Sequence, residues 1–371
     1  MTKPSTRRTL PNSDEIEISV FGPGFGECIV AHIGAGHWLV VDSCIDKQTQ
    51  TPVALAYFNE LGIDPATSVD LVLATHWHDD HVAGIDEVMA ACPNAQFWCS
   101  DALRSPEFLQ LTEVDLKRKG LKFTRGVKYI GSLIDTLGHK FNFALASMRI
   151  LKTSLSIGGQ TIDVEAWSLS PSQAEHVVAL RNLSDLFNAT GPETTLPDRN
   201  PNHASVAMLL SIGEQQILLG ADLEETGNSG HGWSAVVSNT TRPHPIRADA
   251  FKVPHHGSVT GHLDAAWSDL TNGEPIAVLT PYRIGDNVLP QPTDVTRIVK
   301  LSKSAFITKE SYDQRPVKRP VSIAKLAPAT LRRLHKTPGH VRLRRPIAST
   351  GDWEVTLFDG ATELANFKQP T

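Results

Sequence analysis

The sequence predicts an α/β protein in which two layers of strands carry helices on their outer sides, followed by a basic C-terminal extension. Three observations support this fold class. Short apolar runs of strand length alternate with helical patterns. Glycine-rich turns separate several pairs of runs. Metal-binding residue types directly follow several of the expected strands. The 371 residues, 40% of them hydrophobic, suffice for one large domain or one domain with an appendage.

The first hundred residues alternate between strand and helix patterns. A hairpin is expected to turn through Gly34-Ala35-Gly36, because glycine tolerates the backbone conformation that tight turns require. The run at 69–74, apolar except for Asp70, is typical of a strand buried on both faces. The expected strands lie at 17–20, 28–33, 38–41, 69–74 and 96–99, and the expected helices at 51–61 and 83–91.

The middle of the chain predicts a charged helical region followed by further strands. Residues 101–145 have a helical pattern, with a helix start at Ser105-Pro106-Glu107. Residues 174–188 fit either a helix or a covering loop, and residues 190–202 are irregular in pattern. The expected strands of this part lie at 148–155, 161–169, 205–211, 216–219, 251–253 and 276–280, with a helical stretch after Asp222.

The pattern weakens beyond residue 297, where prolines recur, and residues 340–344 and 353–358 predict a terminal hairpin. We therefore divide the chain into a polar N-terminal tail (1–15), a main domain (16–296) and the basic C-terminal extension (297–371). The 121 residues between His81 and His203 are long for a connection, so residues 82–202 are expected to contain an insertion over the cleft.

Composition excludes several classes of protein. No apolar run approaches the about 20 residues that cross a bilayer, and residues 1–13 do not resemble a secretory signal. Four cysteines without a C-x-x-C pair do not form a disulfide scaffold, so a cytoplasmic location is expected, with no membrane contact. The net charge is −5, yet residues 314–351 hold ten Lys or Arg and no Asp or Glu. This stretch predicts nucleic acid or a nucleotide as a partner, or else a solvated basic surface. Protein partners are not indicated.

The segment after residues 69–74 carries the strongest chemical signal. It reads H-x-H-x-D-H, with His76, His78, Asp80 and His81 at a strand-to-helix turn. Imidazole and carboxylate groups are good ligands for zinc and similar divalent ions. Further groups of this kind follow or begin other strands: Asp222, the pair His255 and His256, and His203 beside Asn202.

Taken together, these motifs resemble the metallo-β-lactamase superfamily, and within it the metal-hydrolase domain of the competence protein ComEC. The similar segments span about residues 16–285: 20–28, 39–42, the histidine turn, Asn202 with 205–206, 218–222 and 252–258. The resemblance implies an αββα four-layer sandwich and two divalent metal ions, with Zn2+ expected and Mn2+ as the alternative.

The resemblance also implies individual roles. His76 and His78 would bind the first metal, Asp80 and His81 the second, and Asp222 would bridge them. His255 would complete the second site and His256 would donate a proton. The third ligand of the first metal is either His203 or Asn202. With Asn202, either the first site would be weakened or the enzyme would hold a single metal.

Asp42 and the segment from His335 to His340 also carry residue types found at metal sites. Asp42, at the end of the strand at 38–41, is expected to orient the histidine turn, as metal ligands generally require; a simple turn residue is the alternative. His335 to His340 looks like a third-histidine element of lactonases and glyoxalases, but it follows the last expected ligand and is interpreted as coincidence.

These features predict a metal-dependent hydrolase. A metal-bound water becomes a hydroxide near neutral pH; Asp80 or Asp222 would hold it and His256 would protonate the leaving oxygen. The favoured substrate is a phosphodiester or nucleic acid, because two ions suit the attacking and leaving oxygens. The alternatives are a small ester, lactone or lactam, and a non-catalytic metal-binding module that presents the basic stretch to a partner.

Overall fold

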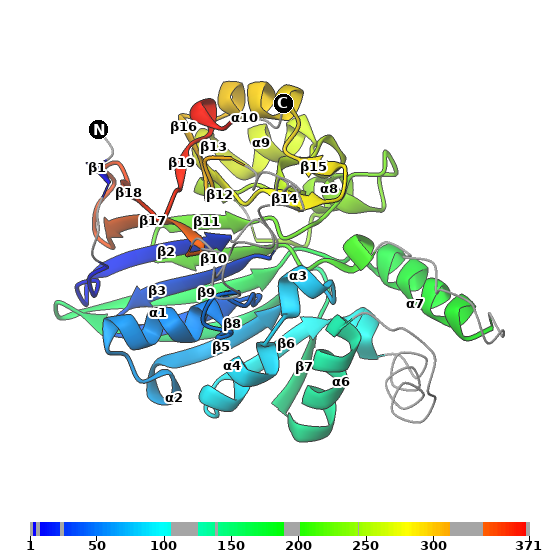
Figure 1. The fold of residues 1–371 in the computed structure, drawn as a ribbon, viewed down its shortest axis with the longest axis horizontal. Coiled ribbons are helices and arrows are strands. Elements are labelled where there is room, and N and C mark those ends of the chain that lie inside the picture. Colours follow the sequence, from blue (N-terminus) through cyan, green and yellow to red (C-terminus); the bar gives the residue numbers. More distant parts are fainter. Residues whose placement is uncertain are drawn as a thin grey trace, which may run out of the picture.

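Two β-sheets stack face to face in the computed structural model, and helices cover both outer faces (Figure 1). The structure describes residues 3–4, 8–22, 26–104, 125–137, 140–188, 201–243, 245–311 and 337–368. The predicted α/β fold with four layers is confirmed. Within these residues, no helix is both long and apolar enough to span a bilayer.

The first sheet has nine strands, and its middle strands are apolar on both faces. Strands β4 to β7 run parallel, whereas β17, β2, β3 and β4 are antiparallel neighbours. In spatial order the strands are β1 (Lys3–Pro4), β18 (Glu354–Phe358), β17 (Gly339–Pro346), β2 (Glu15–Gly22), β3 (Cys28–Gly34), β4 (His37–Val41), β5 (Val69–Ala74), β6 (Gln96–Ser100) and β7 (Phe141–Ala144).

The second sheet has eight strands, of which β11, β12, β13 and β16 run parallel. A separate hairpin, β14 (Tyr282–Ile284) and β15 (Asn287–Leu289), lies outside both sheets. In spatial order the eight strands are β19 (Thr362–Glu363), β16 (Ser304–Ile307), β13 (Thr271–Leu279), β12 (Ala248–Lys252), β11 (Gln215–Leu219), β10 (Met208–Ile212), β9 (Gln160–Ser168) and β8 (Met148–Ile157).

Three apolar clusters hold the layers together. One fills the space between the sheets, where side chains such as Ile18 and Leu210 are buried. The other two lie on the outer faces, under the helices. The first sheet is covered by α1 (Val53–Leu61), α4 (Ile85–Ala91) and α6 (Arg125–Leu137), and the second by α8 (Gly232–Ser238), α9 (Asp264–Leu270) and α10 (Pro292–Leu301). The short α2 (Pro65–Ser68) follows α1, α3 (Asp79–Val82) follows β5, and α7 (Gln173–Asn188) projects from the body (Figure 1).

Most predicted strands are confirmed, but two helical predictions change. The expected helix 83–91 begins two residues later, as α4 at Ile85, because Gly84 before it adopts a left-handed conformation with φ of 76°. Residues 101–145 are not helical throughout, since β7 extends the first sheet within them. The helix start at Ser105 lies outside the described residues, as do 190–200 of the irregular stretch.

The predicted insertion at 82–202 contributes strands to both sheets. It supplies β6 and β7 to the first sheet and β8 and β9 to the second. These strands contact the core, and Leu151 and Val164 lie in the cluster between the sheets. Much of this stretch is therefore part of the sandwich, and α7 is the part that projects (Figure 1).

The described residues of the predicted C-terminal extension also belong to the sandwich. β17 pairs with β2 along its whole length, and β16 continues the second sheet beside β13. The predicted hairpin of β17 and β18 is confirmed. A boundary at residue 296 would cut both sheets, because alternate side chains of β17, Val341 and Leu343, fill the core between them. Residues 312–336, with seven of the ten basic residues of 314–351, lie outside the described residues.

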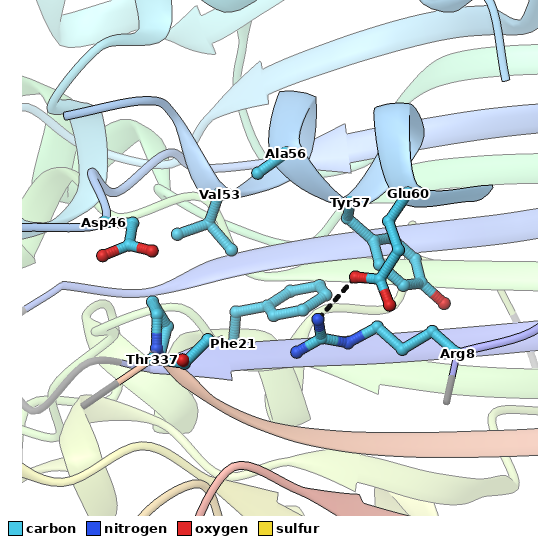
Figure 2. Close-up of a pocket in the computed structure, with 9 residues that line it drawn as sticks. Arg8, Phe21, Asp46, Val53, Ala56, Tyr57, Glu60 and Thr337 are labelled. Atoms are coloured by element: carbon cyan, nitrogen blue, oxygen red, sulfur yellow. Dashed lines mark hydrogen bonds and ion pairs between the residues drawn. The ribbon is translucent and has the colours of Figure 1, made fainter. Parts of the chain in front are cut away.

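The N-terminal segment likewise packs against the body. β1 pairs in parallel with β18. The Arg8 guanidinium lies 2.6 Å from a Glu60 carboxylate oxygen on α1, beside a small cavity of about 40 Å3 (Figure 2). Arg8 also pairs with Asp359 at 2.5 Å and donates to His340 Nδ1. The described part of residues 1–15 is thus attached to α1, β17 and β18.

Candidate metal centre

The predicted ligands meet because their strands end at one edge of the sandwich. His76, His78 and Asp80 follow β5, Asp222 follows β11, and His256 follows β12. β4 and β5 are parallel neighbours, as are β11 and β12, so their carboxyl ends lie together. Strand ends fix a side chain in position better than a free loop does.

Five of these side chains form one buried cluster. Asp222 Oδ2 lies 3.4 Å from His81 Nε2, 3.6 Å from His256 Nε2 and 4.0 Å from His76 Nε2. Asp80 Oδ2 lies 3.5 Å from His256 Nε2 and 4.0 Å from His81 Nε2. The Asp222 carboxylate therefore lies between a subsite with His76 and a subsite with Asp80, His81 and His256.

The spacing of these atoms fits a divalent ion. Two ligands that bind zinc at 2.0–2.1 Å with tetrahedral geometry lie about 3.3 Å apart, close to the distances among His81, His256 and Asp222. His81 Nε2, His256 Nε2 and Asp222 Oδ1 are buried and have no hydrogen-bond partner within the described residues. Buried polar atoms without partners are costly. The two imidazole nitrogens lie beside Asp222 Oδ2, and a cation among them would satisfy them.

His76 and His78 extend the cluster. His76 Nε2 lies 3.1 Å from His78 Nδ1, so the two imidazoles present neighbouring nitrogens. His76 is fully buried, and its Nδ1 contacts Thr75 Oγ1 at 3.0 Å. This pair matches the ligands expected for a first metal, with Asp222 on its other side.

The expected role of Asp42 is supported by its contacts. Asp42 Oδ2 accepts hydrogen bonds from His81 Nδ1 at 2.7 Å and from Thr75 Oγ1 at 2.8 Å. Its other oxygen accepts one from the Thr75 backbone N–H at 2.8 Å. Because His81 Nδ1 donates to a carboxylate, its Nε2 lone pair is directed into the cluster.

The structure places His256 in the cluster, whereas the sequence predicted His255 as the ligand. His256 is 1% exposed and lies in the cluster, with its ring stacked on Tyr282 at 5.0 Å. His255 is half-buried, and its Nδ1 lies 2.9 Å from Glu224 Oε1. Both residues have positive φ, 45° and 53°, and this backbone path directs the second imidazole inwards.

Asn202, and not His203, is the neighbour that contacts the site. Asn202 is buried, and its Nδ2 lies 3.4 Å from His255 Nε2. His203 is half-buried and makes no hydrogen bond or ion pair with the cluster in the part of the chain that the structure describes. Of the two residues, Asn202 is therefore the one that contacts a predicted site residue, His255.

Burial and charge act against each other within the cluster. Burial, together with His81 and His78, holds the pKa of His76 well below its ordinary value, which leaves a neutral imidazole available as a ligand. Burial would also lower the pKa of His81, but the Asp222 and Asp42 carboxylates raise it well above its ordinary value. Burial opposes ionisation of Asp222, yet His81 and His256 keep its pKa well below the usual range.

A cavity of about 230 Å3 opens beside Asp80. Its lining also includes Asp79, Gly26, Cys44 and Tyr129, and Asp80 is the member of the second subsite that borders it. Asp79 is held by α6, where the Gly126 N–H donates to its carboxylate at 2.6 Å. This cavity is the candidate entrance for a substrate.

Residues that the site analysis of the sequence missed lie behind the cluster. Glu27 and Lys252 form a buried ion pair of 2.7 Å, and Thr280 links Glu27 to His256. The available signal was a lysine within the apolar segment 251–253, since lysine is almost never fully buried without a partner.

His340 belongs elsewhere. It is buried in β17 between Phe21 and Phe358, with ring centroids 4.1 and 4.8 Å away, and its Nε2 contacts Ser19 Oγ. Its interpretation as a coincidental match agrees with this position, and His335 lies outside the described residues.

Comparison with known protein families identifies the superfamily of the chain. The model of the metallo-beta-lactamase superfamily matches residues 21–268. Similar solved structures include BJP-1 of Bradyrhizobium japonicum, a subclass B3 metallo-beta-lactamase (13% identity, 74% of this chain and 86% of that one, TM-score 0.34). Another is the metallo-beta-lactamase MIM-1 of Novosphingobium pentaromativorans (16% identity, 64% of this chain and 76% of that one, TM-score 0.29). A third is Zn2+-bound PqqB of Methylobacterium extorquens (12% identity, 76% of this chain and 74% of that one, TM-score 0.31). No curated protein sequence matches the chain. Since the family model covers well over half of the residues, the chain belongs to the metallo-beta-lactamase superfamily.

Proposed function

We propose that this protein is a hydrolase with two divalent metal ions, Zn2+ or Mn2+, that cleaves phosphodiesters. The observation that carries the proposal is the buried cluster around Asp222, in which two groups of ligand atoms share one carboxylate. His76 and His78 would hold one ion, and Asp80, His81 and His256 the other, with Asp222 between them. The bound ions would supply a nucleophile near neutral pH and offset charge on the scissile group.

The protein's own groups orient the reaction. Asp42 and Thr75 fix the histidine turn, so the ligand atoms are in place before a substrate arrives. His255, at the rim, is placed to protonate the leaving oxygen: Glu224 and Thr260 hold its Nδ1, and its Nε2 lies beside Asn202. This assigns to His255 the role that the sequence gave to His256.

The phosphodiester class rests on two arguments. The motifs resemble the metal-hydrolase domain of ComEC, and two ions suit a reaction in which both oxygens carry charge. Nucleic acid remains the proposed partner, through the basic residues of 315–336. Arg342, Arg344 and Arg345 are at most 8% exposed, so the proposal no longer includes them.

The test compares hydrolysis of a panel by protein loaded with Zn2+ or Mn2+: bis-p-nitrophenyl phosphate, single-stranded DNA, RNA, a cyclic nucleotide, a lactone and a β-lactam. Asp80→Ala and Asp222→Ala are expected to abolish phosphodiester cleavage. Asp70→Ala is the matched control, because Asp70 lies at the opposite end of β5 and pairs with His37. Cleavage of the lactone or β-lactam alone would overturn the phosphodiester class. Equal rates in wild type and both site variants would overturn the metal mechanism.

A further inference from the structure

The ion pair between Glu27 and Lys252 is buried next to the second subsite. Glu27 Oε1 lies 2.7 Å from Lys252 Nζ, and the two residues are 0% and 2% exposed. Burying two charges costs more than most pairs recover, so such a pair calls for a reason beyond stability. The contacts of the Glu27–Lys252 pair with the loops that carry the proposed ligands supply such a reason.

Glu27 is connected to His256 through a hydroxyl group. Thr280 Oγ1 donates to Glu27 Oε2 at 2.6 Å and lies 3.0 Å from His256 Nδ1. The hydroxyl has a single proton, which Glu27 accepts, so the oxygen must accept from His256 Nδ1–H. The Thr280 carbonyl, 3.2 Å from the same nitrogen, makes the same demand. The lone pair of His256 is thereby placed on Nε2, the atom that faces Asp80 and Asp222.

The same pair contacts the two other loops of the subsite. The Glu27 backbone N–H donates to the Asp80 carbonyl at 2.8 Å. Lys252 Nζ donates to the Ala221 carbonyl at 3.2 Å, one residue before Asp222. One buried pair thus touches the loops that carry Asp80, Asp222 and His256.

We propose that Glu27, Lys252 and Thr280 form a positioning unit that fixes the tautomer and direction of His256 and so sets the metal affinity of the second subsite. The inference rests on the proposed metal function and deepens it. These residues act through His256 and touch neither metal nor substrate.

The experiment titrates metal-free protein with Zn2+ against a chromophoric chelator, with thermal unfolding of each metal-free variant measured in parallel. Glu27→Gln and Thr280→Val are expected to weaken one of two Zn2+ equivalents about 10–100-fold, the usual effect of losing a group that orients a ligand. Thr280→Ser keeps the hydroxyl and is expected to bind as wild type does.

The matched control is Glu17→Gln. Like Glu27, Glu17 is 0% exposed and pairs with a cation, Arg344. Its carboxylate contacts Tyr57 of α1 and not the cluster. It is expected to lower thermal stability while leaving both Zn2+ affinities unchanged.

The outcomes separate the inference from the function it rests on. The positioning unit would be supported if wild-type protein binds two Zn2+ equivalents, if Thr280→Val binds one of them more weakly, and if Thr280→Ser binds both as the wild type does. Folded Thr280→Val that binds both equivalents within twofold of wild type would overturn it, even if Glu27→Gln fails to fold. Wild-type protein that binds no Zn2+ would overturn the proposed function and the inference with it.

Discussion

Replacing Arg344 with methionine tests whether the basic strand β17 serves the fold or a partner. The Arg344 guanidinium lies 2.6 Å from Glu17 Oε2 and is bonded to Thr9, and the side chains of Arg344 and Glu17 are 9% and 0% exposed. Arg344→Met would leave the Glu17 carboxylate buried, with the Ser19 and Tyr57 hydroxyls, each 2.6 Å away, as its remaining side-chain partners. Breaking a buried pair from one side costs about 3–5 kcal/mol, a large part of the about 5–15 kcal/mol that stabilises a typical domain.

The assay is urea unfolding followed by tryptophan fluorescence, with nucleic-acid binding measured in parallel. Adding Glu17→Gln to Arg344→Met removes the unpaired charge and is expected to recover most of the loss. The control is Arg149→Met, which breaks a surface pair with Glu165 and should change stability by about 1 kcal/mol or less. The reasoning is refuted if Arg344→Met unfolds at the wild-type urea concentration and loses nucleic-acid binding instead.

Three further predictions concern pH, metal and packing. Burial lowers the pKa of His32 from 6.5 to about 4, and its neutral ring bonds Glu15 and Gly36. Between these two pH values the unfolded chain binds a proton at His32 and the folded chain does not. The free energy of unfolding should therefore fall by about 3 kcal/mol as pH falls from 6.5 to 4. In denaturant titrations, the free energy of unfolding of His32→Gln should depend less on pH than that of the wild type. Chelation of bound metal should lower the melting temperature by a few degrees, restored by Zn2+, because the ion binds the folded state alone; an unchanged value would contradict the buried site. Gly126→Ala would place a Cβ 1.9 Å from the Trp77 carbonyl oxygen, so it should displace α6 from the histidine turn and lower the melting temperature; a wild-type value would show that α6 docks differently.

The sequence predicts a strand well where nearly all of its side chains are apolar and buried. β5 is apolar on both faces because it lies in the parallel part of its sheet, and its predicted bounds are those of the structure. β17 is harder to interpret, because His340, Arg342 and Arg344 alternate with Val341 and Leu343. The alternation predicts a strand, but a basic face suggests solvent. In the structure this basic face of β17 is covered by Glu17 and the N-terminal segment, which are more than 300 residues away in the sequence.

The candidate site shows the same division between local and distant information. The H-x-H-x-D-H turn places four candidate ligands by local geometry alone, so the sequence indicates them directly. The order of His255 and His256 depends on two left-handed residues in succession, which nothing in the residue types requires. The sequence therefore could not tell which of the two lies beside Asp80 and Asp222, and the backbone places His256 there.

Buried charge links the positioning unit to the metal site. Four carboxylates, Glu27, Asp42, Asp80 and Asp222, lie within or beside the cluster at 0–6% exposure, and Lys252 is the buried ammonium among them. With neutral imidazoles they carry a net charge of −3, more than one divalent cation offsets. Without metal, a proton on His81 relieves part of this charge, and a metal must displace that proton to bind. The two proposed ions would offset this charge, and their affinity should rise with pH as His81 is deprotonated.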